Sequence, residues 1–261
     1  MLPDRFWLLL ATLVYGLTCV GSFYRAPHRL FKPTPFLFGS FIVALGFHTV
    51  FLIQRGNLIK HCPVSSLFEV LIFGAWSLGL AYLIVGPLYR MTLLGALTSP
   101  VIFLVLVFTQ IAIPDKLSLT FPKSPMLELH AALNILAYGA LGLAGLTSII
   151  FLLQESWLKH KSAMGLLTHL PSLHNLAQVQ RHLLSYGLIL LTLGLASGLL
   201  LPEVQNWLVL GWAIAIWLLY LIILSFNFTQ RLSGKKTAVY SLLLYLMLLF
   251  TFWNVKHIPY S

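Results

Sequence analysis

The sequence predicts an all-α protein: a polytopic membrane bundle of about eight transmembrane helices, with both termini outside. Of its 261 residues, 59% are hydrophobic and only 8% are charged. The apolar residues form runs long enough to cross a bilayer as helices, and these runs lack the alternation of barrel strands. We expect residues 1–261 to form a single integral-membrane domain.

Eight apolar segments are expected to span the membrane. They are roughly Phe6–Phe23, Phe36–Ile53, Ser65–Val85, Met91–Ile113, Leu129–Leu153, Leu183–Leu201, Trp207–Phe226 and Thr237–Trp253. The first is interpreted as a span rather than a signal peptide, because Asp4 and Arg5 give the N-terminus no positively charged region.

The distribution of Lys and Arg predicts the orientation. One set of loops holds ten of them: Arg25, Arg29, Lys32, Arg90, Lys159, Lys161, Arg181, Arg231, Lys235 and Lys236. The other side holds six: Arg5, Arg55, Lys60, Lys116, Lys123 and Lys256. Because basic loops stay in the cytoplasm, we expect a multi-pass protein of the plasma (inner) membrane with both termini outside.

Charge and cysteine content exclude other classes. The net charge of +10 would suggest nucleic acid in a soluble protein, but here the basic residues lie in short loops and act as topology signals. No nucleic-acid partner is therefore expected. Cys19 and Cys62 form no spaced pair, which argues against a disulfide framework or a zinc site.

Polar residues gather on the predicted outer face. His130, Asn134 and Tyr138 follow at helical spacing at the start of the fifth span, so they share one helix face. Further polar or aromatic residues are predicted at the same membrane level: His61, Glu69, Glu203, Asn206, Trp207 and His257. A polar stripe entering an apolar span is costly unless it faces protein, water or a ligand.

Three of these residues, His61, His130 and His257, are histidines from separate loops or helix ends. Histidine is a ligand for haem iron and other metals, and two neutral imidazoles can fill both axial positions of a haem. The alternative is that each histidine is merely interfacial.

Glu69 also has two interpretations. Ser65 or Ser66 can cap the third span with Glu69 at or near the capping-box position, and a cap alone would explain the glutamate. Alternatively, Glu69 orients an outer-face histidine or carries a proton, because an acid embedded in a membrane is a functional candidate.

Other features are interpreted structurally. The glycines of the fifth and sixth spans, including Gly194 and Gly198, suit close helix packing, and Pro100 is expected to kink the fourth span. His48 lies inside the second span, where a hydrogen-bonded, bundle-facing histidine is favoured over a ligand. The inner loop Gln154–Arg181 is expected to be solvated and partly helical, and its histidines match no metal motif.

Five segments together resemble a known family. Pro63–Glu69, running on to Trp76, is similar to the P-L-S-N-L-Y-E segment of CcsA-type cytochrome c assembly proteins. Leu94–Pro100 resembles their L-G-A-I-T-A-P, and Leu191–Gly198 their L-T-I-G-I-L-S-G. Leu129-His130 with Tyr138 resembles their M-H-V segment. Asn254–Tyr260 is loosely similar to their C-terminal residues.

The resemblance implies a haem-handling role. In that family two external histidines bind haem on the outer face and present it to apocytochrome c. By motif these map onto His130 and His257 here, with Glu69 and Trp207 as further cofactor-binding candidates. The sequence departs from the family at two places. Asn227–Arg231 replaces a segment that normally holds a membrane-embedded histidine, and Leu201–Trp207 replaces a tryptophan-rich loop. These departures make the chain more similar to the shorter HemX and YpjD members.

We therefore expect a haem-handling membrane subunit of cytochrome c biogenesis that binds or passes haem at the outer face. A ResB/CcsB-type membrane partner and apocytochrome c are the implied partners, besides haem and the lipid bilayer. No catalytic residue is assigned, and whether the chain contributes to a cytochrome c synthase stays open. The alternatives are a HemX-like accessory or regulatory protein without haem and, third, a small-solute transporter, for which no pair of interrupted helices provides a site.

Overall fold

Eight α-helices build the computed structural model, which describes residues 3–24, 35–88, 92–115, 124–160, 171–201 and 207–255. In chain order they are α1 (Pro3–Tyr24), α3 (Pro35–Ile59), α4 (Leu67–Leu88), α5 (Thr92–Ala112), α6 (Pro125–Lys159), α8 (Leu173–Leu199), α9 (Trp207–Phe228) and α10 (Gly234–Val255). In the described residues, seven of them, all except α10, meet the length and hydropathy expected of a membrane span. The predicted all-α polytopic membrane bundle is confirmed.

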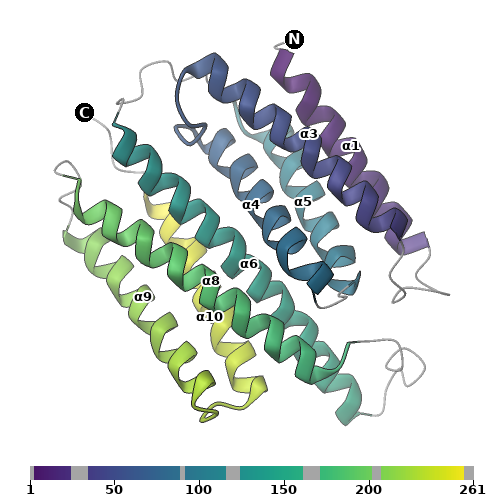
Figure 1. Ribbon diagram of the computed structural model, residues 1–261, viewed down its shortest axis with the longest axis vertical. Coiled ribbons are helices and arrows are strands. Elements are labelled where there is room, and N and C mark those ends of the chain that lie inside the picture. The colour runs from purple at the N-terminus through teal and green to yellow at the C-terminus, as the bar shows by residue number, and fades with distance from the viewer. Residues whose placement is uncertain are drawn as a thin grey trace.

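The helices run up and down beside one another (Figure 1). On one side α1 packs against α3 and α5, and α5 against α4. On the other, α6 packs against α8 and α10, while α9 contacts α8 and α10. Helix α4 joins the two groups by packing against α6, which makes α6 the most buried span of the bundle.

Two helices are longer than their apolar stretches. Ser124 stands at the N-cap of α6, Pro125 begins the helix, and the helix runs for 35 residues to Lys159. Helix α8 begins at Leu173, where the side chain of Ser172 accepts a hydrogen bond from the Asn175 amide, ten residues before the predicted span. The predicted inner loop is thus helical at both ends. A helix can continue past its apolar residues into water, where a side-chain cap such as Ser172 satisfies its first backbone amides.

The bundle has two ends of different character. At one end α1, α4, α6 and α9 begin and α3, α5, α8 and α10 end, and we call it the charged end because Asp4, Arg5, Arg55, Glu69 and Asp115 lie there. Helix α1 begins and α10 ends on this side, as Figure 1 shows. The even number of helices therefore returns the chain to the side on which it started.

Candidate functional site at the charged end

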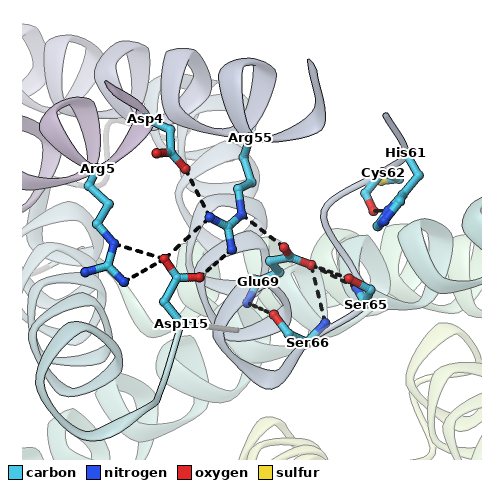
Figure 2. A network of polar contacts seen from close by, with 9 residues as sticks. All are labelled: Asp4, Arg5, Arg55, His61, Cys62, Ser65, Ser66, Glu69 and Asp115. Atoms are coloured by element: carbon cyan, nitrogen blue, oxygen red, sulfur yellow. Dashed lines mark hydrogen bonds and ion pairs between the residues drawn. The ribbon is translucent and has the colours of Figure 1, made fainter. Parts of the chain in front are cut away.

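A buried ion network joins four helices at the charged end (Figure 2). The guanidinium of Arg55 on α3 donates to Glu69 at the start of α4 over 3.0 Å and to Asp4 on α1 over 3.1 Å. It also pairs with Asp115, which follows α5. Arg5 donates to the same Asp115 over 2.7 Å. Arg55 and Glu69 are fully buried, so four chain segments converge on one guanidinium.

The charges in this network do not cancel. Three carboxylates, those of Asp4, Glu69 and Asp115, face two arginines, which leaves a formal charge of −1. A buried carboxylate is stable only when it is paired and hydrogen-bonded, because removing it from water costs several kcal/mol. Arg55 is therefore the central element of the network, since it contacts all three carboxylates.

Glu69 has a second set of partners in its own chain segment. Its Oε2 accepts hydrogen bonds from the Ser65 hydroxyl over 2.7 Å and from the amides of Ser65 and Ser66. In return the Ser66 hydroxyl accepts from the Glu69 amide over 3.2 Å. This reciprocal pair is a capping box with Ser66 at the N-cap, as the sequence suggested. Glu69 thus caps α4 and pairs with Arg55 at once.

The loop between α3 and α4 connects the network to α6. The amide of Cys62 donates to Glu128 in the first turn of α6 over 3.0 Å. His61, beside it, is buried and its Nδ1 lies 2.9 Å from the Cys62 carbonyl oxygen. Residues 61–66 therefore bridge the ion network on one side and the start of α6 on the other.

His130 lies two residues after Glu128 on α6 and faces α8. Its Nδ1 is 2.7 Å from the carbonyl oxygen of Gly194. A carbonyl only accepts, so Nδ1 carries the hydrogen and donates it, and the neutral imidazole keeps its lone pair on Nε2. The amide of Asn134, one turn below, lies 3.3 Å from Nε2 and donates to the His130 carbonyl over 2.8 Å.

Two of the three glycines of α8, Gly194 and Gly198, make room for this polar pair. An ideal Cβ on Gly198 would lie 2.6 Å from Cε1 of His130, and one on Gly194 would lie 2.7 Å from Oδ1 of Asn134. Both separations are shorter than the 3.0 Å below which Cβ atoms essentially never approach another heavy atom. The polar stripe on α6 and the GxxxG on α8, which looked independent in the sequence, are the two sides of one helix contact.

The donor set at His130 is compatible with one axial ligand of a haem iron. A histidine that binds a metal through one ring nitrogen usually donates the N–H of the other to a carbonyl or carboxylate. This hydrogen bond fixes the tautomer and the ring orientation. Gly194 supplies that carbonyl here, and Nε2 is the nitrogen that would bind iron once the Asn134 amide, 3.3 Å away, turns aside. Within the described residues no group of three or more His, Cys, Asp or Glu side chains could hold a metal ion on its own.

The other predicted site residues are placed differently. Both carboxylate oxygens of Glu69 are engaged by Arg55 and the Ser65–Ser66 cap, so Glu69 orients an arginine and a loop. Trp207 begins α9 with 77% of its surface exposed. His257 lies outside the described residues, as do Glu203 and Asn206, so ligation shared by His130 and His257 stays a prediction.

His48 differs from the hydrogen-bonded core histidine favoured by its sequence position. It is fully buried between helices of the first group, close to the Ile72 backbone and with its ring edge-on to Tyr15 at 6.2 Å. Neither ring nitrogen makes a hydrogen bond with the described residues, and the Tyr15 hydroxyl also lacks one. His48 is therefore a bundle-facing histidine beside the Ile72 backbone, and no described residue around it assigns it a ligand role.

Sequence reasoning missed Arg55, Asp4 and Asp115 as parts of the site. The positive-inside rule treats Arg55 only as a loop charge, whereas it lies inside the helix that continues to Ile59. A charged residue next to an apolar span usually pairs with a residue of opposite charge. The position of Arg55 in the sequence could therefore have indicated a buried acidic partner. Which acid would meet it depends on how helix ends assemble, and spacing along the chain does not specify that.

Several known proteins are similar to this chain. A cytochrome c biogenesis protein CcsA of Chlamydomonas reinhardtii is 26% identical over 223 residues, which cover 78% of this chain and 61% of that protein. Protein HemX of Brevibacillus brevis is 30% identical over 165 residues, 62% of this chain and 61% of that protein. CcsA of Pyropia yezoensis is 25% identical over 299 residues, 95% of this chain and 91% of that protein.

The first two matches thus span about three fifths of the length of those relatives. A family model, described as Cytochrome C assembly protein, matches residues 64–259 and so includes Glu69, His130, Gly194 and Gly198. Since the matched residues make up well over half of the chain, it belongs to the cytochrome c assembly protein family.

Proposed function

We propose that this membrane protein binds or passes haem at the outer face of the plasma membrane during cytochrome c biogenesis. The observation that carries the proposal is the geometry of His130. Its Nδ1 hydrogen is held by the Gly194 carbonyl, and Gly198 provides the space for the ring. Iron would bind Nε2 in place of the Asn134 amide, whose nitrogen lies 3.3 Å from it. Because Gly194 offers a backbone carbonyl, no second side chain has to be immobilised to hold the His130 ring in one orientation.

The remaining parts of the proposal rest on the family resemblance. His257 would supply a second axial ligand, and exposed Trp207 would contact the haem from the start of α9. Glu69 would act indirectly, by holding residues 61–66 beside Glu128 and thus near the start of α6. A ResB/CcsB-type partner would complete the site and apocytochrome c would receive the haem.

The test is the absorption spectrum of protein purified from cells with an intact haem supply. We expect a low-spin haem signal in the parent that is lost in His130→Ala and kept in His174→Ala. His174 is the matched control because it is exposed in the first turn of α8, at the opposite end of the bundle. A parent without haem would contradict the proposal and favour a HemX-like accessory or regulatory protein. A haem signal that survives His130→Ala would remove His130 from the ligand set.

A further inference from the structure

A pocket of about 390 Å³ lies between α4, α6 and α8, away from the charged end. Its walls are Ala81 and Ile84 of α4 and Tyr186 and Ile189 of α8, and Leu136 and Ala140 of α6 form its floor. The volume falls in the range of small-molecule sites, roughly 300–1,000 Å³. The pocket exists because α4 and α8 both pack on α6 but hardly touch one another.

The pocket lies within the membrane. At 1.5 Å per residue, its lining residues on α4 are about 15–27 Å from the first residue of that helix, which begins at the charged end. The hydrocarbon core of a bilayer is about 30 Å thick, so this depth corresponds to the middle of the membrane and the leaflet at the opposite end. Ile84, Tyr186 and Ile189 are 46–57% exposed, so the pocket opens sideways into lipid.

The lining offers no free hydrogen-bonding group in its interior. Ser77, the polar residue on α4, already donates to the Gly74 and Ile135 carbonyls over 2.8 and 3.0 Å. The only other polar side chain in the lining belongs to Tyr186 at the exposed rim. Small side chains at Ser77, Ala81 and Ala140 give the pocket its depth. It therefore suits an apolar chain and would penalise a polar solute.

The rim indicates which end of such a ligand is polar. His182, one turn from Tyr186 toward the opposite end, stacks on the Tyr186 ring at 6.3 Å. Aromatic residues with polar tips favour the level of lipid head groups. We propose that this pocket binds an acyl chain of a bilayer phospholipid, with the head group near His182 and the chain lying over Leu136 and Ala140. The lipid seals the seam between the two helix groups, independently of any haem chemistry.

The test uses the full chain in phosphatidylglycerol–phosphatidylethanolamine nanodiscs that contain a trace of phosphatidylcholine with a diazirine on one acyl chain. After irradiation, modified residues are mapped by mass spectrometry. We expect labelling at Leu136 and Ala140, because Ala140 is only 4% exposed and lipid surrounding a closed bundle does not reach it. Labelling confined to outward-facing residues, such as Leu218 of α9, would overturn the proposal.

Two variants sharpen the result. Ala140→Leu fills the floor and Ala81→Leu fills a wall, and each should reduce labelling of Leu136 several-fold without changing labelling of Leu218. Ala215→Leu is the matched control, because Ala215 is exposed on α9 outside the pocket. Unchanged Leu136 labelling in a folded Ala140→Leu or Ala81→Leu protein would also overturn the proposal. Should neither variant fold, the labelling pattern of the parent decides.

Discussion

At the residue scale, side chains of the charged end take their chemistry from other helices. Cys62 illustrates this, because it follows α3 yet lies against Glu128 of α6. Burial raises the pKa of Cys62 to about 11, and the carboxylates of Glu128 and Glu69 contribute to the increase. The thiol is therefore neutral, and unreactive as a nucleophile, throughout the physiological range.

Alkylation of Cys62 should follow this raised pKa. In a Cys19→Ser background, which leaves one thiol, we expect the maleimide rate to rise about tenfold per pH unit and to level off near pH 11. In denatured protein the rate should level off near the ordinary thiol pKa of 9.0. Glu128→Gln removes one negative charge and should shift the native profile toward lower pH. Identical native and denatured profiles would show that Cys62 is not in this environment.

At the element scale, Arg55 links the ends of α1, α3, α4 and α5 through its ion pairs. Removing one member of a buried ion network leaves the others desolvated and unpaired. Substitutions of Arg55 and of Glu69 change the formal charge of the network in opposite directions. Losing Arg55 takes it from −1 to −2, whereas neutralising Glu69 takes it to zero.

Arg55→Gln should consequently lower the free energy of unfolding by about 3–5 kcal/mol. Glu69→Gln keeps the capping box and should cost less. Unfolding in mixed micelles by added dodecyl sulfate measures these differences. Lys159→Gln is the control, since its exposed pair with Glu155 contributes under about 0.5 kcal/mol. Equal effects of Arg55→Gln and Lys159→Gln would refute the role of the network.

The contact between α6 and α8 gives a second prediction at this scale. Gly198→Ala would place a methyl group 2.6 Å from the His130 ring, so the ring or the helix must move. We expect a loss of about 1–3 kcal/mol, typical of overpacking, and displacement of Nδ1 from the Gly194 carbonyl.

The control is Gly211→Ala on α9, where a new Cβ meets nothing within 4 Å. That change should be neutral or stabilise the helix by up to about 1 kcal/mol. The same dodecyl sulfate titration compares the two variants, and the haem spectrum reports on His130. A Gly198→Ala protein as stable as Gly211→Ala would mean that the helices are not so close.

At the scale of the whole molecule, the first described helix begins and the last one ends on the same side of the bundle. Helix α6 has 35 residues and is about 52 Å long at 1.5 Å per residue. It therefore exceeds a hydrocarbon core of about 30 Å. Because His130 lies near its start, much of the excess projects beyond the opposite end, together with the first turns of α8.

The orientation of this bundle is open to a direct test. Ten basic residues on the side of the α6–α8 connection against six on the other predict that the charged end faces outside. Alkaline phosphatase fused after Ser261 should be active, and the same enzyme inserted between residues 161 and 170 should be inactive. A fluorescent protein that matures only in the cytoplasm should give the opposite pattern. Reversed results would put His130 inside and end the proposal of haem handling at the outer face.

The sequence by itself determined the class of the molecule and most of its helices. Long uncharged runs have few folded alternatives in a bilayer, because each backbone polar group must be satisfied within its own segment. The same local logic identified Ser65 or Ser66 with Glu69 as a cap, since a capping box depends on residues three apart, and the structure selects Ser66. Helix length was less predictable: polar residues continue α6 and begin α8 beyond the apolar stretch.

Only the tertiary structure decided which partners these residues have. It paired Glu69 with Arg55 and Asp115 with both arginines, and it set His130 and Asn134 against Gly198 and Gly194. It also left His48 without a hydrogen bond in the described part of the chain. The physical reason is that hydropathy and capping act within one helix, whereas ion pairing and close packing depend on the order and rotation of neighbouring helices. Those are fixed by side-chain shape across contacts between residues far apart in the sequence.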